Sequence, residues 1–163
     1  MIDTRALRTA FGRFATGVTV ITATAPDGER VGLTANSFSS VSLDPPLLLW
    51  CLGKASDCLP VFSRAEHFAI NILAETQRDV AQCFATKLID RFAQVAWQAG
   101  ACGAPRIDDC VAWFECRIAA RHDAGDHIIM VGEVEHFGHN EGKPPLLFFA
   151  GRYGRADRHP GDA

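Results

Sequence analysis

Alternation of apolar and polar residues is clearest in the second half of the chain, where it predicts two long strands. In Val111–His122 every second residue is apolar, and Glu115, Arg117 and Arg121 occupy the opposite face. A period of two is the spacing of side chains that share one face of a strand. After an Ala-Gly-Asp turn, His127–Phe137 is expected to return as the antiparallel partner.

A second hairpin is predicted near the N-terminus. Val18–Ala25 is β-branched and apolar, a Pro-Asp-Gly turn follows, and Arg30–Asn36 runs back. The continuous apolar run Leu47–Leu52 predicts a strand that is buried on both faces. Shorter apolar or alternating runs predict further extended segments at Val41–Leu43, His67–Leu73 and Leu146–Ala150.

Helical periodicity appears at the start of the chain. The apolar residues Leu7, Ala10, Phe11 and Phe14 follow the i, i+3, i+4, i+7 spacing of one helix face. Asp3 or Thr4 can cap this helix, and Gly17 is expected to end it.

Two more short helices are predicted farther along. Ser56 is expected to cap a helix that runs to about Arg64. Thr76 and Asp79 have the spacing of a capping box and are expected to open another helix. Its inner face would carry Val80, Cys83 and Phe84. Residues 86–103 show no regular pattern.

The predictions total six or seven strands against two or three short helices. The strands meet at hairpins and not through repeated βαβ crossovers, so the expected fold class is mainly β, an antiparallel barrel with peripheral helices. Internal repeats, low-complexity tracts and linkers are absent from the sequence. We therefore expect one domain over residues 1–154 and a polar, flexible tail over residues 155–163.

Composition narrows the classes of function. The chain has 163 residues, of which 48% are hydrophobic and 21% charged, as in ordinary globular domains. Its net charge of −3 disfavours a nucleic-acid partner. This length leaves no room for a separate dinucleotide-binding domain beside a substrate domain. Because the sequence shows neither an export signal nor an apolar run of about 20 residues, we expect no membrane association and a cytoplasmic location.

Metal and thiol chemistry are disfavoured as well. The six cysteines form no CxxC pair and no zinc-site spacing, so reduced and mostly buried thiols are expected. His136 and His139 lie three apart on a predicted strand, where they point to opposite faces. A metal shared between them is not expected.

A polar segment is the most unusual feature of the sequence. Dinucleotide, P-loop, metalloprotease and serine-hydrolase motifs are all absent, but residues 32–42 carry six small hydroxyl or amide side chains. Such a segment is typical of a polar edge strand, or of a wall that binds a flat heterocycle rich in acceptors. Residues 53–57 are expected to contain the start of a helix directly after a strand. The free N–H groups at such a helix start favour binding of a phosphate. Alternatively, Ser56 only caps its helix.

These segments resemble the short-chain flavin reductase family, the reductase components of two-component flavin-dependent monooxygenases. The specific part is residues 17–22, GVTVIT, followed by residues 32–46, GLTANSFSSVSLDPP. Short segments similar to the family follow in order, namely DRF at 90–92, GDH at 125–127, GEV at 132–134, PLLFF at 145–149 and RYG at 152–154. The resemblance covers about residues 7–154.

The resemblance implies a fold, an assembly and an activity. The fold would be a Greek-key, FMN-binding split barrel, assembled as a homodimer with the flavin near the subunit interface. The activity would be that of an NAD(P)H-dependent flavin reductase, which transfers hydride from NADH or NADPH to FMN or FAD. Reduced flavin would then be supplied to a partner monooxygenase.

The resemblance also implies site residues. The cofactor-binding residues would be Thr34, Ala35, Asn36, Ser37, Ser40, Cys51, Leu52, Ala55, Ser56, Lys87, Arg91, Phe92 and Tyr153. The catalytic residue would be His127, close to the nicotinamide, where it orients the donor or gates its entry. Each has a structural alternative: Arg91 paired with Asp90, His127 as a surface residue, and Tyr153 as core packing.

Two other functions fit the same residues. A related flavoprotein would retain its flavin and reduce another acceptor, such as a corrinoid or a metal complex. A split-barrel module could also bind flavin, haem or a pyridoxine-related ligand without turnover.

Overall fold

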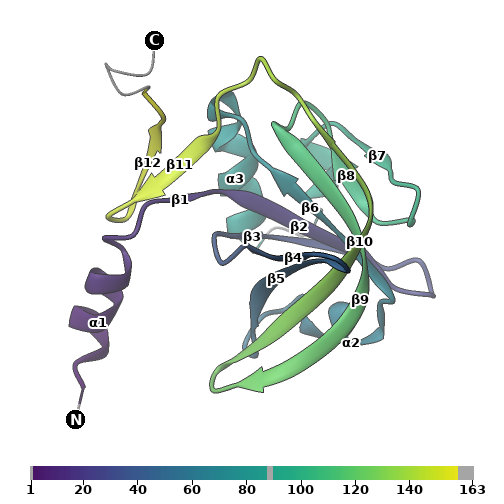
Figure 1. Cartoon of the computed structure of the whole chain (residues 1–163), viewed down its shortest axis with the longest axis horizontal. Coiled ribbons are helices and arrows are strands. Elements are labelled where there is room, and N and C mark those ends of the chain that lie inside the picture. The colour runs from purple at the N-terminus through teal and green to yellow at the C-terminus, as the bar shows by residue number, and fades with distance from the viewer. Residues whose placement is uncertain (1, 88–89, 158–163) are drawn as a thin grey trace.

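The computed structural model describes residues 2–87 and 90–157 and is built mainly of antiparallel strands (Figure 1). The largest sheet has the strand order β3-β2-β6-β9-β10-β5-β4 and curls into a barrel. Its strands are β2 (Thr19–Thr24), β3 (Arg30–Ala35), β4 (Ser39–Leu43), β5 (Pro46–Gly53), β6 (His67–Ile72), β9 (Ala112–Ala124) and β10 (His127–His139). The expected mainly β class and both expected hairpins are confirmed.

Two small sheets and short helices complete the described fold. The first sheet pairs β1 (Thr16–Gly17), β11 (Leu146–Phe149) and β12 (Arg152–Arg155), and the second pairs β7 (Trp97–Ala99) with β8 (Pro105–Ile107). The helices are α1 (Thr4–Phe11), α2 (Leu59–Arg64) and α3 (Arg78–Ala85), with 3₁₀ turns at Glu75–Gln77 and Phe92–Gln94. None of the helices in the described ranges is long and apolar enough to cross a membrane.

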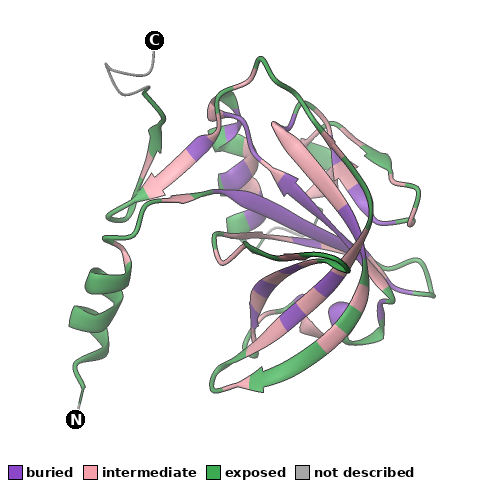
Figure 2. Cartoon of the chain, viewed as in Figure 1, coloured by how far each residue is buried: buried purple, intermediate pink, exposed green. Residues whose placement is uncertain are grey.

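The barrel interior holds the main hydrophobic core (Figure 2). Trp50 lies at its centre, with edge-to-face contacts to Phe62 at 5.0 Å and Phe68 at 5.9 Å between ring centroids. Burying each of these side chains stabilises the fold by about 1.5–3 kcal/mol. A second cluster lies under α3 and includes Val20, Phe84 and neighbouring apolar residues.

The apolar sequence of strand β5 predicts burial on both faces, but the structure buries only one face. Leu48, Trp50 and Leu52 are buried, whereas Leu47 and Cys51 on the other face are partly exposed. One face packs on the barrel core, and the other face lies on the open side of the sheet.

Glu115 is the clearest departure from simple alternation. The expected polar face of β9 should expose it, yet its side chain is only 1% exposed. Its carboxylate accepts hydrogen bonds from the backbone N–H groups of Ala101 at 3.1 Å and Cys102 at 3.3 Å. A buried carboxylate is tolerated where such donors satisfy it, and here it fixes the turn between β7 and β8.

The helix boundaries also differ from the expected ones. Helix α1 begins after Asp3, whose carboxylate accepts from the N–H groups of Arg5 and Ala6, but it ends at Gly12 and not at Gly17. The N-cap of α2 is Cys58 and not the expected Ser56. Pro60 lies in the first turn of the helix, where its missing N–H is tolerated. Ser56 accepts instead from the Cys58 N–H.

The expected Thr76–Asp79 capping box does not form. Thr76 is exposed, and the Gln77 side chain accepts from the Ala74 N–H in its place. The irregular region expected at 86–103 contains a 3₁₀ turn and β7, and residues 152–155 add the unexpected strand β12. Of the expected flexible tail, residue 155 belongs to β12, and residues 158–163 lie outside the described residues.

Gly132 offers a test of barrel packing. A Cβ placed there would overlap the Phe68 ring and lie 2.8 Å from the Cys116 Cβ. We expect Gly132→Ala to lower the free energy of unfolding by about 1–3 kcal/mol in urea denaturation. Gly17→Ala is the matched control because a Cβ there meets nothing within 4 Å. A Gly132→Ala variant as stable as the control would contradict this packing.

Candidate functional site

Three polar segments of the chain meet at one end of the barrel. The Ser37 hydroxyl accepts from the Cys51 N–H at 2.9 Å and donates to the Cys51 carbonyl at 3.4 Å, joining the segment after β3 to β5. The register of β5 against β10 places Gly53 opposite His127. The Lys54 N–H donates to the Asp126 carbonyl at 2.9 Å, so the loop after β5 lies beside the β9–β10 turn.

The polar groups of residues 34–37 differ in whether the chain itself already uses them in hydrogen bonds. The Thr34 hydroxyl donates to the Ala81 carbonyl of α3 at 2.7 Å, and Ala35 accepts from the Thr19 hydroxyl at 2.7 Å. Asn36 is exposed, and its side-chain amide makes no hydrogen bond within the described part of the chain. Asn36 is therefore the polar side chain of this segment that is free to contact a ligand.

Two residues of the neighbouring strand lie differently. Cys51 is partly exposed beside Ser37, whereas the Leu52 side chain is fully buried in the barrel core. Leu52 pairs with Ile128 of β10 and therefore presents no exposed surface to a ligand. Ala55 is exposed and Ser56 is half-buried in the loop that follows.

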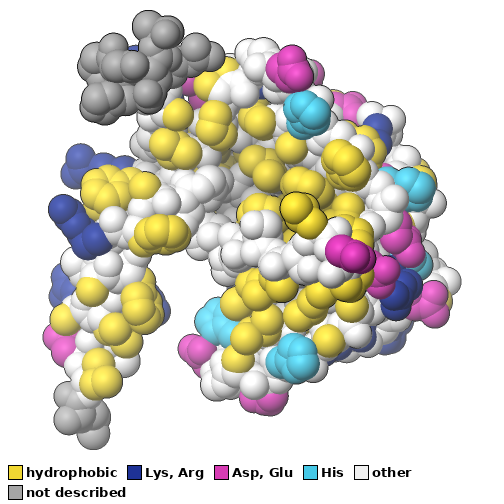
Figure 3. All heavy atoms as spheres, in the orientation of Figure 1, with side chains coloured by type: hydrophobic (Ala, Val, Ile, Leu, Met, Phe, Trp, Pro, Cys, Tyr) yellow, Lys and Arg dark blue, Asp and Glu magenta, His cyan; other side chains and the backbone are white. Residues whose placement is uncertain are grey.

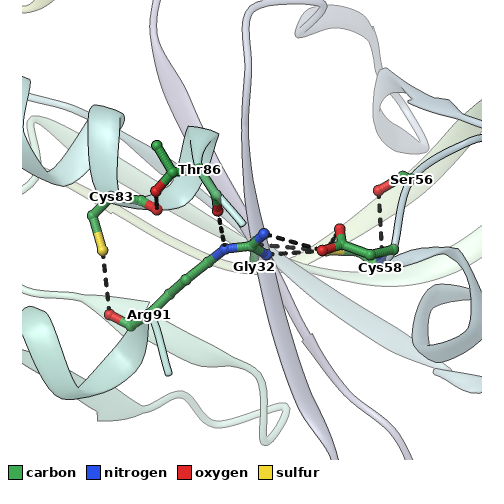
Figure 4. Close-up of polar contacts among 7 residues, drawn as sticks. Gly32, Ser56, Cys58, Cys83, Thr86 and Arg91 are labelled. Carbon is green, nitrogen blue, oxygen red and sulfur yellow. Dashed lines mark hydrogen bonds and ion pairs between the residues drawn. The ribbon is translucent and has the colours of Figure 1, made fainter. Parts of the chain in front are cut away.

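Arg91 ties three separate segments together (Figure 4). Its Nε donates to the Thr86 carbonyl at 2.8 Å, and Nη1 donates to the Gly32 carbonyl at 2.9 Å. Nη2 lies 3.2 Å from the Asp57 carboxylate, so the partner of Arg91 is Asp57 and not Asp90. The guanidinium thus links β3 to the loop before α2 and to the segment after α3.

A cavity of about 220 Å³ opens beside this guanidinium. Its lining residues come from the same three segments and are Glu29, Arg30, Val31, Gly32, Asp57, Cys58, Asp90, Arg91 and Phe92. The cavity combines an aromatic ring, two guanidinium groups and three carboxylates. It is therefore suited to a polar ligand that carries both a charged and an apolar part.

His127 opens β10 at the tip of the long hairpin. Its side chain is half-exposed, and Nδ1 lies 2.7 Å from the Asp126 carboxylate. This contact leaves Nε2 on the side of Gly53, where a Cβ on residue 53 would lie 3.7 Å away. With Nδ1 engaged, Nε2 is the ring nitrogen available to a ligand.

Two of the expected site residues, Ser40 and Tyr153, lie away from this end of the barrel. Ser40 lines a different, apolar groove with Leu43 and Phe137. Tyr153 belongs to the small β1-β11-β12 sheet, where its ring packs edge-to-face on Phe148 at 5.5 Å. Lys87 is exposed and adjoins residues 88–89, which lie outside the described residues.

Comparison with known proteins decides the family. Residues 11–157 match the model of the Flavin reductase like domain. The chain belongs to this family. It is 49% identical to the FMN reductase (NADH) SmoA of Agrobacterium fabrum, over 96% of the chain and 88% of that protein.

Other members of the family extend the comparison. The chain is 50% identical, over 91% of its length, to the reductase component of the flavin-dependent trigonelline monooxygenase of Acinetobacter baylyi. It spans about half the length of several curated relatives, this one included. The structure of Streptomyces globisporus NADH:FAD oxidoreductase SgcE6, in complex with NAD and FAD fragments, matches with a TM-score of 0.90 at 40% identity, over 99% of the chain and 95% of that structure.

The lining of the cavity also includes residues that the sequence analysis does not assign to the site, among them Asp57, Cys58 and Gly32. Asp57 belongs to the 53–57 segment, which the sequence analysis identifies as a possible phosphate site. Gly32 carried no such signal. A Cβ on residue 32 would overlap the Phe84 ring, and the carbonyl of residue 32 becomes a partner of Arg91 only through the fold.

The thiols of Cys58 and Cys83, which contact Arg91, are not activated. Burial raises the pKa of Cys58 and of Cys83, and it raises the pKa of Cys110 to about 12. All six cysteines are free of disulfide bonds. Within residues 2–87 and 90–157, no group of three His, Cys, Asp or Glu side chains could hold a metal ion.

The contact between His127 and Asp126 can be tested by titration. The hydrogen bond from His127, followed by its charge, holds the pKa of Asp126 below its ordinary value. Because the folded pKa is depressed, this contribution to stability is present above the ordinary carboxyl pKa and is lost as the pH falls through the folded value.

We expect carboxyl-carbon NMR to show this depressed pKa and His127→Ala to return it to the ordinary range. Asp109, whose pKa Lys143 lowers, serves as the control and should not change. An Asp126 titration that is the same in both proteins would show that the contact does not form in solution.

Proposed function

We propose that this chain is an NAD(P)H-dependent flavin reductase that transfers hydride to FMN or FAD and supplies the reduced flavin to a partner monooxygenase. The observation that carries the proposal is the meeting of the Asn36–Ser37 segment, the loop after β5 and Arg91 at one end of the barrel. The family resemblance implies that the same segments bind a flavin.

The residues present fit a flavin nucleotide. Asn36 offers an amide that has no hydrogen-bond partner among the described residues, and the exposed Ala55 and half-buried Ser56 follow strand β5. Arg91 and Lys54 supply positive charge on either side of this loop. Such a set matches a ring with several acceptors at one end and a phosphate at the other.

Bound flavin would supply the hydride-accepting ring, so this chain needs residues that position its ligands more than a strong acid or base. Asn36 would hold the ring edge, Ser37 keeps the segment against β5, and Arg91 would stabilise the phosphate end. His127 would contact the hydride donor through Nε2, while Asp126 holds the imidazole orientation through Nδ1.

The relatives support the cofactors and the partner. SmoA is named an FMN reductase (NADH), and SgcE6 is an NADH:FAD oxidoreductase. The Acinetobacter relative is the reductase component of a flavin-dependent monooxygenase. We propose the same roles for NADH, for either flavin and for a monooxygenase here. Action in the cytoplasm is consistent with six free thiols.

We also propose that the chain works as a homodimer. Helix α1 has eight residues, none of them buried, and its apolar side chains form an exposed stripe beside the barrel (Figure 3). Phe11 and Phe14 are 70% and 79% exposed. Isolated helices this short are unstable in water, so α1 needs a surface to pack on, and a second copy supplies one.

An anaerobic titration tests the proposed activity. The purified protein is mixed with FMN, FAD or neither, and its spectrum is followed as NADH or NADPH is added. We expect bleaching of the flavin and turnover with excess free flavin. A yellow protein that never exchanges its flavin would indicate a retained cofactor, and a protein without flavin binding or NAD(P)H oxidation would refute the reductase.

His127→Ala separates positioning of the donor from binding of the flavin. We expect flavin reduction to slow by about 10-fold or more in stopped-flow measurements, with a smaller change in the flavin Kd. His122→Ala, on the same hairpin, is the control. Equal reduction rates in the His127→Ala variant and the parent would count against a role for His127.

Phe11→Glu tests the role of α1 in assembly. Placing a charge on its apolar stripe should shift the protein from dimer to monomer in sedimentation analysis. Thr9→Glu adds the same charge to the opposite face of the helix and should leave the dimer intact. A parent protein that sediments as a monomer would contradict the homodimer.

A further inference from the structure

The two cations beside the loop of residues 53–58 already have carboxylate partners within the chain. Arg91 Nη2 lies 3.2 Å from Asp57, and Lys54 Nζ lies 2.8 Å from both carboxylate oxygens of Asp123. A phosphate at Arg91 or Lys54 therefore meets a positive charge that is already neutralised, whereas Arg30, which lines the same cavity, packs on the Trp97 ring. Binding of the phosphate has to compete with these internal carboxylates.

The Arg91 guanidinium stays in place without Asp57. Its Nε and Nη1 are held by the carbonyls of Thr86 and Gly32 at 2.8 and 2.9 Å. These are neutral acceptors on the backbone of two different segments, so they fix the plane of the guanidinium and leave its charge uncompensated. Asp57 supplies the compensating charge through Nη2 alone.

Asp57 is the exchangeable member of the pair. The Arg91 side chain is 12% exposed, whereas the Asp57 side chain is 52% exposed and lies in the loop before α2. Both residues line the same cavity of about 220 Å³. Another oxyanion in this cavity could take the place of Asp57 at Nη2 while Arg91 keeps its two backbone bonds.

We propose that Asp57 competes with the flavin phosphate for Arg91 and thereby weakens flavin binding. This inference rests on the proposed function, because a reductase that supplies reduced flavin to a partner must release it. Asp57 is then the residue that limits the affinity for flavin, and Arg91 is the group through which it acts.

Asp57→Asn tests the competition, because the amide keeps the shape of the side chain and removes its charge. We expect the Kd for FMN to fall by about fivefold at low salt, the size of effect typical of one exposed ion pair. This gain should shrink at high salt. Riboflavin lacks the phosphate, so its Kd should not change. Flavin fluorescence quenching measures both constants.

Asp90→Asn is the matched control. Asp90 lines the same cavity, but its carboxylate accepts from the Ala93 N–H and has no contact with Arg91 in the described residues. We expect a markedly smaller change in the FMN Kd for this variant. An equal gain in both variants would show a general effect of charge and would overturn competition at Arg91.

Two other results would also overturn the inference. If Asp57 only orients Arg91, Asp57→Asn will bind FMN more weakly than the parent. If Asp57 acts on the ring and not on the phosphate, riboflavin will gain as much as FMN. Asp57→Ser provides a second uncharged variant, and thermal melting verifies that both are folded. A parent that binds no flavin at all would instead refute the proposed function.

Discussion

The pairing of β5 with β10 is the constraint on which the rest of the structure depends. Strand β10 pairs with β9 on one side and β5 on the other, and its register places His127 opposite Gly53. This pairing holds β5, which carries Trp50 of the barrel core, in the large sheet, and it brings the loop after β5 beside the tip of the β9–β10 hairpin. The same backbone hydrogen bonds that stabilise the barrel therefore assemble the candidate site.

Electrostatic balance at this site fits an enzyme that must release its ligand. Arg91 has a fixed position and a compensated charge, and Lys54 is paired with Asp123. A phosphate at Arg91 or Lys54 therefore has to displace a carboxylate that already neutralises the cation. The cavity beside Arg91 is therefore suited to reversible occupation.

Helix α1 shows where a single chain falls short of a complete structure. Its cap is well formed by Asp3, yet none of its residues is buried by the part of the chain that the structure describes. Tyr153, which the family resemblance assigns to the cofactor, lies on the small β1-β11-β12 sheet, where it packs on Phe148. A second copy would cover α1, in line with the proposed dimer.

The sequence by itself determined the two hairpins, the mainly β class and the polar 34–37 segment, because a period of two and turn residues are local signals. Tertiary structure decided which polar groups remain available. Glu115 is buried because the distant N–H groups of residues 101 and 102 satisfy it, and Thr34 is engaged by the carbonyl of Ala81. Arg91 pairs with Asp57 and not with the adjacent Asp90, because the fold brings the loop before α2 beside the segment after α3. Local periodicity fixes which face a side chain occupies, but only the packing of distant segments decides which partner it meets there.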